Sequence, residues 1–138
     1  TSVATHGATG TFIVPRHATN IYYNTETTVT NTALYNQITG NSATWEEFLD
    51  VEADMAARQL LLYRQDPFMF HQSNVVTFEH PGWSSGSASL LALWTQAVVD
   101  KVLEYSSFPI NAYPHGELRD RLLTRMANDA CTVDAYAE

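Results

Sequence analysis

The sequence predicts an α/β fold in which short strands alternate with amphipathic helices. Apolar residues recur with helical spacing over 44–65, 87–106 and 116–130, and brief apolar runs of strand length lie before and between these segments. The predicted order is strand, loop, helix, strand, helix, strand, helix. Such alternation is typical of parallel strands, so functional side chains are expected beyond the carboxyl ends of the strands.

The strands are predicted from short apolar runs that have a clear end. Thr11–Val14 forms the first run, and Pro15 ends it because proline cannot donate to a sheet ladder. Phe68–Phe70 indicates a buried strand that leads into the polar residues His71–Asn74 at its carboxyl end. Pro109–Tyr113 is a third strand candidate.

The first helix is predicted from its capping signal. Thr44 and Glu47 match a capping box, which starts a helix over 44–65, and Asp66-Pro67 ends it. The Thr- and Asn-rich stretch from Asn20 to Thr32 has neither helical nor strand periodicity. It is therefore predicted to be a long loop.

The composition indicates a folded domain and excludes several classes of partner. The 138 residues fit a single domain, and because 45% are apolar, disorder is not expected. A net charge of −8 would repel phosphate backbones and anionic membranes, so no nucleic acid is expected as a partner. No apolar stretch approaches the ~18 residues of a membrane span. The Thr- and Asn-rich first third and the single lysine, Lys101, favour a secreted protein.

The beginning of the chain and its one cysteine both lead us to expect a processed or excised piece. Residues 1–10 have neither the charged head nor the apolar run of a signal peptide, and the first residue is not Met. Cys131 can close no disulfide within the chain. It is expected to be a free thiol or half of a bridge to a cysteine outside these residues.

The histidines provide candidate chemistry but no recognisable metal site. None of the five stands four residues from another, so the helical pair that grips zinc is missing. His71 follows three bulky apolar residues and precedes Gln72 and Asn74, whose amides can hold its ring. This placement suits a proton donor at the end of a strand, or else a core histidine bonded to a backbone carbonyl.

Two further groups are candidates for recognition. Arg16 follows the first strand and can point its guanidinium at a carboxylate, to orient a catalytic acid or to form a structural ion pair. Asn20, Tyr22, Tyr23 and Asn24 set two aromatic faces among amides. That composition suits sugar stacking and hydroxyl recognition, and equally suits loop aromatics that pack back on the core.

A serine-hydrolase motif is present but lies in the wrong context. Gly82–Gly86 matches G-x-S-x-G, and Asp100 and His115 follow in the chain order of a hydrolase triad. A nucleophile elbow requires a tight turn from strand to helix, whereas Glu79–Pro81 intervenes here and Asp100 falls within a predicted helix. A flexible segment with serine caps is the preferred interpretation.

Two strings carry a family resemblance. Val14–Asn24 and Asp66–Asn74 together resemble the extracellular polysaccharide deacetylases of the fungal galactosaminogalactan deacetylase type, which are relatives of the NodB-like carbohydrate esterases. Three shorter stretches are similar to the C-terminal part of the same family: Leu90–Trp94, Phe108–Ile110 and Arg125–Cys131. The likeness covers most of the chain from about residue 11.

The resemblance implies a distorted (β/α) barrel that removes N-acetyl groups from an amino-sugar polymer with the help of a divalent metal ion, zinc first. In such enzymes one Asp and two His hold the metal, a second Asp is the base, and a His protonates the leaving amine. By motif, His71 matches that general acid and Arg16 the residue that orients the base. The residues Asn20, Tyr22, Tyr23 and Asn74 are expected to bind the substrate.

The family's Asp-Asp pair and His-x-x-x-His motif precede the arginine motif, and neither stands before Arg16 here. The resemblance therefore implies the C-terminal portion of a barrel whose metal ligands lie in the remaining N-terminal part, and a chain that is inactive alone. The alternative is a non-catalytic carbohydrate-binding or structural fragment, in which Tyr22, Tyr23 and Trp83 contact glycan.

The incomplete barrel generates a testable prediction about association. A parallel barrel that lacks its first strands exposes a sheet edge and an apolar face, both of which favour contact between copies. The 138-residue chain should therefore associate or aggregate in sedimentation velocity. A monodisperse, stable monomer would contradict this prediction.

Overall fold

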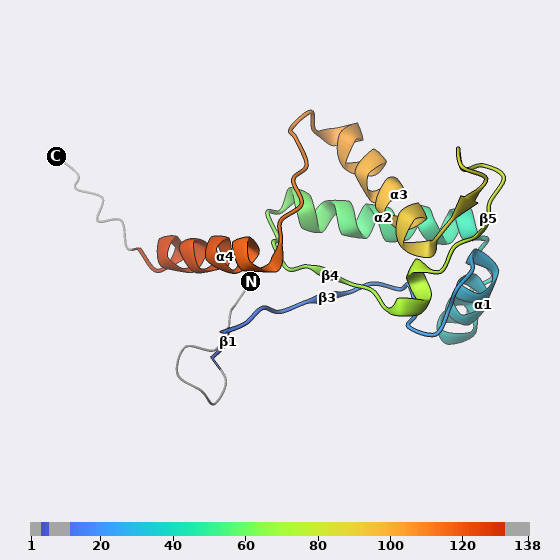
Figure 1. Ribbon diagram of the computed structural model, residues 1–138, viewed down its shortest axis with the longest axis horizontal. Helices are drawn as coiled ribbons and strands as arrows, with labels where there is room; N and C mark the ends of the chain where they lie inside the picture. Colours follow the sequence, from blue (N-terminus) through green and yellow to red (C-terminus); the bar gives the residue numbers. More distant parts are fainter. Residues whose placement is uncertain (1–3, 6–11, 132–138) are drawn as a thin grey trace. The chain divides into compact units, whose positions relative to one another are not determined.

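The computed structural model describes residues 4–5 and 12–131, which fold as helices joined by short strands and loops (Figure 1). They divide into two compact units. The central unit comprises residues 17–64 and 68–110, and the terminal unit comprises the described residues within 1–16, 65–67 and 111–138. The mixture of helix and strand agrees with the predicted α/β class. Each sheet formed by the described residues has two strands, so these residues do not close a barrel by themselves.

The central unit is built on one parallel pair of strands. β3 (His17–Ala18) pairs with β4 (Phe68–Met69) in the register His17 to Phe68 and Ala18 to Met69. The connection between them runs through two helices, as a parallel pair requires. The predicted strand at 68–70 and its parallel pairing are thus confirmed. The remaining elements of the unit are α1 (Thr28–Thr39), α2 (Trp45–Leu61), a 3₁₀ turn (Gln72–Val75), β5 (Phe78–Glu79), β6 (Ser87–Ala88) and α3 (Leu90–Tyr105).

The prediction of a long loop from Asn20 to Thr32 is wrong, because α1 begins within it. Thr27 caps the helix, since its hydroxyl accepts from the Thr30 backbone N–H at 3.2 Å and its own N–H donates to the Thr30 hydroxyl at 3.2 Å. Gly40 ends the helix in the left-handed conformation (φ 73°), which glycine adopts without steric cost. This capping box uses threonine in place of Glu or Gln, so it lacks the usual sequence signal.

The prediction for α2 is confirmed at its start and too long at its end. Thr44 and Glu47 form the expected capping box, and the helix begins at Trp45. It ends at Leu61, because Tyr63 takes a positive φ of 58° and turns the chain. The bond from the Arg64 N–H to the Gln59 carbonyl, at 3.0 Å, closes this C-terminal turn.

The core of the central unit lies between α2 and α3. Small residues on α2 (Ala53, Ala56 and Ala57) let α3 approach closely, and Phe48 is almost fully buried beside them. The stripe predicted for α3 is confirmed at Trp94, Val98 and Val102, which face this core together with Leu90. Its two other predicted members do not lie in the core, since Leu91 is half-buried and Tyr105 is exposed. Trp94 also meets the rings of Phe68 and Phe70 edge-on, at 4.9 and 5.0 Å between centroids. These ring contacts fasten β4 to the helices.

The terminal unit contains β1 (Ala4–Thr5), β2 (Phe12–Ile13) and α4 (His115–Asp129). The predicted helix over 116–130 is confirmed. It buries Leu118 and Leu122 against Val14 and Tyr113.

Two strand predictions, at 11–14 and at 109–113, need correction. The run at 11–14 gives only the two-residue β2, which pairs antiparallel with β1, and residue 11 lies outside the described part. Residues 109–113 form no strand. Pro109 and Pro114 have no N–H group to donate to a sheet ladder there. The Tyr113 ring instead lies under the Arg121 guanidinium, whose central carbon is 3.8 Å from the ring centroid.

The packing predicts that Phe48 anchors the central unit. Phe48→Ala removes a buried ring that contacts Tyr35 and Trp45 at centroid distances of 4.8 and 5.4 Å. It should lower the free energy of unfolding in urea by about 3–5 kcal/mol. The control Ile38→Ala changes an exposed residue of α1 and should stay within about 0.5 kcal/mol. A loss below about 1 kcal/mol for Phe48→Ala would contradict this packing role.

Candidate functional site

Polar segments follow both strands of the parallel pair and lie against each other. Residues 19–25 follow β3, and residues 71–75 follow β4. The Thr19 hydroxyl donates to the Met69 carbonyl at 3.2 Å, and the Ser73 hydroxyl donates to the Tyr23 carbonyl. The structure therefore brings together five of the six predicted site residues beyond the carboxyl ends of the strands, as a parallel pair predicts. These five are Asn20, Tyr22, Tyr23, His71 and Asn74.

His71 and Tyr23 form the exposed face of this site. Their rings meet in an edge geometry, with centroids 5.9 Å apart and planes at 67°. Both residues are solvent-exposed, so His71 is not a core histidine. Its backbone N–H donates to the Asn74 side-chain oxygen at 2.9 Å, which fixes the chain where the imidazole branches off. An exposed imidazole beside an aromatic ring can exchange a proton with a bound molecule.

Asn74 is fully buried and connects the two segments. Its side-chain N–H group donates to the carbonyls of Tyr22 and Thr25, at 2.8 and 3.0 Å, while its oxygen accepts from His71. The Asn74 amide thus forms hydrogen bonds with backbone groups of both segments. This arrangement gives Asn74 a positioning role in the site.

Asn31 of α1 holds the same loop from another side. It is fully buried, and its side-chain oxygen accepts from the Tyr22 N–H and the Thr25 hydroxyl, both at 2.9 Å. Its amide nitrogen donates to the Asn20 carbonyl at 3.2 Å. Sequence reasoning missed Asn31, because the stretch that contains it has no periodicity and is predicted to be loop.

Glu52 of α2 holds the beginning of the loop. Both of its carboxylate oxygens accept from Asn20, at 2.9 Å from the backbone N–H and 2.7 Å from the side-chain amide. Glu52 is buried, so these two bonds replace the water that its carboxylate loses. A signal was present in the sequence, because Glu52 stands four residues after Phe48 and four before Ala56, on the apolar face of the helix.

Tyr22 contributes a phenol that stays protonated. Burial raises the pKa of Tyr22 above its ordinary value of 10.0, and the neighbouring Tyr35 and Glu52 raise it further. Tyr22 is half-buried, and the residue after it, Tyr23, is exposed. A neutral phenol can both donate to and accept from a sugar hydroxyl or acetamide group.

Arg16 belongs to the terminal unit, whereas the other five predicted residues lie in the central unit. It is exposed and immediately precedes β3 in the chain. The orienting role implied for it stays a prediction.

The serine-hydrolase interpretation finds no support in the fold. Ser84 and Ser85 lie in the turn between the antiparallel strands β5 and β6, and not between a strand and a helix. Asp100 lies on the exposed face of α3, where it accepts from the Gln96 amide at 2.8 Å. The match to G-x-S-x-G is therefore a turn sequence.

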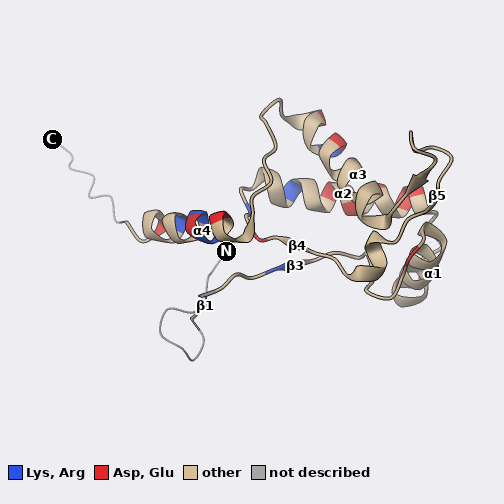
Figure 2. Ribbon diagram, in the orientation of Figure 1, with Lys and Arg blue, Asp and Glu red and all other residues tan. Residues whose placement is uncertain are grey.

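The structure also shows where the charged side chains and the cysteine lie, and it bears on the question of a membrane span. Charged side chains of both signs lie along α2, α3 and α4, and few lie on the segments that form the site (Figure 2). Cys131 is exposed, with a free thiol. In the described part of the chain, no helix combines the length and the apolar character of a membrane span.

Comparison with solved structures shows a chain of similar fold. The chain superposes on the crystal structure of Agd3, described as a novel carbohydrate deacetylase, with a TM-score of 0.75 and 28% sequence identity. The match covers 88% of this chain and 19% of that one, so the sequence spans about a fifth of its length. A comparison with curated proteins gave no match.

Residues 1–136 match the family described as the Agd3 deacetylase domain. The chain therefore belongs to this family. The resemblance drawn from Val14–Asn24 and Asp66–Asn74 is thereby confirmed.

The buried amide predicts a specific cost for changing Asn74. In Asn74→Asp a carboxylate oxygen replaces the amide nitrogen, so the carbonyls of Tyr22 and Thr25 lose their donor and face an acceptor. The free energy of unfolding should fall by about 2–3 kcal/mol in urea titrations. The matched control Asn24→Asp, at an exposed position of the same loop, should change it by less than about 0.5 kcal/mol. Equal effects of the two variants would refute the positioning role.

Proposed function

We propose that this chain is part of an N-deacetylase that acts on an N-acetylated amino-sugar polysaccharide and releases acetate. Membership of the Agd3 deacetylase domain family supports the reaction class. The observation that carries the proposal is the exposed His71 imidazole beside Tyr23, held beyond the carboxyl ends of the parallel strands. This is where α/β folds place their reacting groups.

In the proposed reaction His71 is the general acid. A water oxygen attacks the carbonyl carbon of the acetamide while a base from outside these residues takes a proton of the water; the C–N bond then breaks, and the amine nitrogen leaves as it takes the proton from His71. The products are acetate and a free amino sugar. The bond from the His71 N–H to Asn74 supports this role, because it fixes the backbone from which the imidazole extends.

The substrate-binding part of the proposal rests on the loop after β3. The exposed ring of Tyr23 offers a flat apolar face to a sugar ring, and the neutral phenol of Tyr22 offers a donor and an acceptor. Asn20 was expected to contact substrate directly, but both polar bonds described for its N–H groups go to Glu52. In this proposal Asn20 and Asn74 shape the loop, and the two tyrosines touch the polymer.

The metal ion of the proposal is not assigned to residues of this chain. The described residues contain no group of three or more His, Cys, Asp or Glu side chains that could hold a metal ion, so they do not fit a metal site. We propose that residues outside this chain supply the base aspartate and hold a divalent metal ion, with zinc as the preferred candidate.

The remaining parts of the proposal concern the whole enzyme. Arg16, placed directly before β3, would orient the base aspartate through its guanidinium. The parallel pair β3–β4 with its covering helices would form the C-terminal part of a distorted (β/α) barrel, completed by the N-terminal part of the domain. The low content of charged residues and the single lysine favour an extracellular location for this enzyme.

The mechanism predicts that His71 is needed for turnover and not for binding. In the intact enzyme, His71→Ala should abolish acetate release from an N-acetylated amino-sugar polymer and leave polymer binding nearly unchanged, because the proton is required only as the amine leaves. Acetate release and pull-down on the same polymer measure the two effects. The control His115→Ala, at the exposed start of α4, should keep full activity. Unchanged turnover in His71→Ala would remove this residue from the mechanism.

An acetate-release assay of the 138-residue chain alone distinguishes this proposal from the non-catalytic alternative. With added zinc or cobalt it should release no acetate, and addition of the metal-binding part of the domain should restore release. Full activity from these residues alone would contradict the assignment of the metal outside the chain. Polymer binding without acetate release in the completed domain would favour the alternative, a carbohydrate-binding module that uses Tyr22, Tyr23 and Trp83.

A further inference from the structure

A pocket of the central unit lies between the C-terminal ends of α2 and α3. It has a volume of about 350 Å³ and is lined by Leu60, Tyr63, Tyr105, Phe108 and five other residues. A smaller pocket of about 210 Å³ adjoins it, and the two share Leu61 and Tyr105. We name the two together the aromatic groove. The helices diverge toward these ends (Figure 1), which leaves room for the groove.

Three large aromatic side chains of the groove face solvent. Tyr63, Tyr105 and Phe108 are 77%, 66% and 78% exposed. Aromatic rings are usually buried in the core of a folded protein. A cluster of exposed rings around a pocket is therefore typical of a binding surface. None of the three belongs to the core of the unit.

Tyr63 is held on this surface against a local backbone preference. It occupies the position just after α2 with a φ of 58°, where glycine is usual because a side chain crowds the backbone. The turn itself is satisfied by the bonds from Tyr63 N–H to Leu60 carbonyl and from Arg64 N–H to Gln59 carbonyl, at 2.9 and 3.0 Å. Since glycine would make the same turn with less strain, the turn does not account for a tyrosine at this position.

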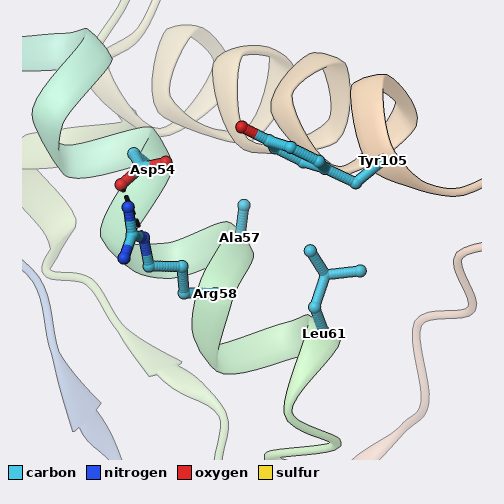
Figure 3. A pocket seen from close by; sticks show the side chains of 5 residues that line it. All are labelled: Asp54, Ala57, Arg58, Leu61 and Tyr105. Atoms are coloured by element: carbon cyan, nitrogen blue, oxygen red, sulfur yellow. Dashed lines mark hydrogen bonds and ion pairs between the residues drawn. The ribbon is translucent and has the colours of Figure 1, made fainter.

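The groove also has a polar edge. Arg58 donates to Asp54 at 2.8 Å at one end of the smaller pocket, and both side chains remain accessible. Figure 3 shows the Tyr105 ring opposite Ala57 and Leu61, with its hydroxyl toward the side on which Asp54 lies. Ser106 adds a hydroxyl to the larger pocket. Aromatic faces with a few donors and acceptors at the edge match the two surfaces of a sugar ring, its C–H face and its hydroxyls.

We propose that the aromatic groove is a second carbohydrate subsite, which binds an N-acetylated amino-sugar segment of the polymer away from the reacting residue. The proposal rests on the proposed function, because it takes its ligand class from that substrate. Tyr63, Tyr105 and Phe108 stack on sugar rings, the apolar floor at Ala57 and Leu61 takes the acetamide methyl, and Asp54 and Arg58 bond hydroxyl or amide groups.

The groove is separate from the site around His71. Glu52, which holds Asn20, lies in the middle of α2, and Leu61 follows it by roughly 14 Å along the helix axis. A single sugar cannot reach both, whereas a polymer segment can. The subsite would therefore strengthen binding of long chains and leave the reaction at a single sugar unchanged.

The test uses the hexamer of N-acetylglucosamine as the probe and the intact enzyme as the protein. Nuclear magnetic resonance titration should shift the amide signals of residues 60–63 and 105–110. Tyr105→Ala should raise the Kd for the hexamer at least fivefold. The matched control Leu103→Ala, an exposed residue of the same helix that lines neither pocket, should change the Kd less than twofold.

Tyr63→Gly separates binding from folding. It should raise the Kd for the hexamer at least threefold while the urea midpoint of unfolding stays the same or rises, because glycine relieves the positive φ. A lower midpoint would show that Tyr63 serves the fold and would overturn its role in binding. No shift of the groove signals, or an unchanged Kd in Tyr105→Ala, would overturn the subsite. If Tyr105→Ala instead abolishes self-association in sedimentation and the hexamer does not bind, the groove is a protein interface.

Kinetic assays of the intact enzyme can show whether the subsite or the proposed function is wrong. Tyr105→Ala should raise KM for a long N-acetylated polymer and leave kcat/KM for a single N-acetylated sugar unchanged, whereas His71→Ala should abolish release from both. A hexamer-binding groove in an enzyme that keeps activity in His71→Ala would refute the role of His71 and retain the subsite. Equal loss on both substrates in Tyr105→Ala would overturn the subsite alone.

Discussion

The loop after β3 depends on three buried polar side chains that reach its backbone from three different elements. Glu52 on α2, Asn31 on α1 and Asn74 in the 3₁₀ turn satisfy N–H and C=O groups between residues 20 and 25. Each of the three is buried, so water does not replace a lost bond and each omission would leave an unpaired polar group. The loop therefore has one conformation only when all of these elements are in place.

This constraint ties the site to the apolar core. Glu52 shares its helix with Phe48 and Ala56, and Trp94 of α3 fixes β4 through the rings of Phe68 and Phe70. Burial of these apolar groups supplies the free energy that holds the polar side chains away from water. The exposed pair of His71 and Tyr23 thus stands on a rigid support, as a reacting group requires. The aromatic groove uses the other end of the same α2–α3 pair, so one scaffold would serve both a reacting group and a polymer-binding surface.

Much of the scaffold was predictable from local sequence. Capping at Thr44, the helical stripes of α3 and α4 and the apolar run at Phe68 each depend on neighbours within a few residues. The loop predicted for 20–32 failed for a local reason as well, because threonines form the capping box at Thr27. The strand expected at 109–113 failed because a strand also needs a partner, and pairing cannot be inferred from one segment.

Residue type and short-range spacing were enough to predict the α/β class, the main helices and the motifs that carry the family. The folded chain was needed to find that His71 is exposed while Asn74 is buried three residues later, and that Glu52 bonds Asn20. It was also needed to find which exposed aromatic residues from the ends of two helices share one groove. These features escape the sequence because burial and hydrogen bonding join residues 32 and 52 positions apart, where no period in the chain reports the contact.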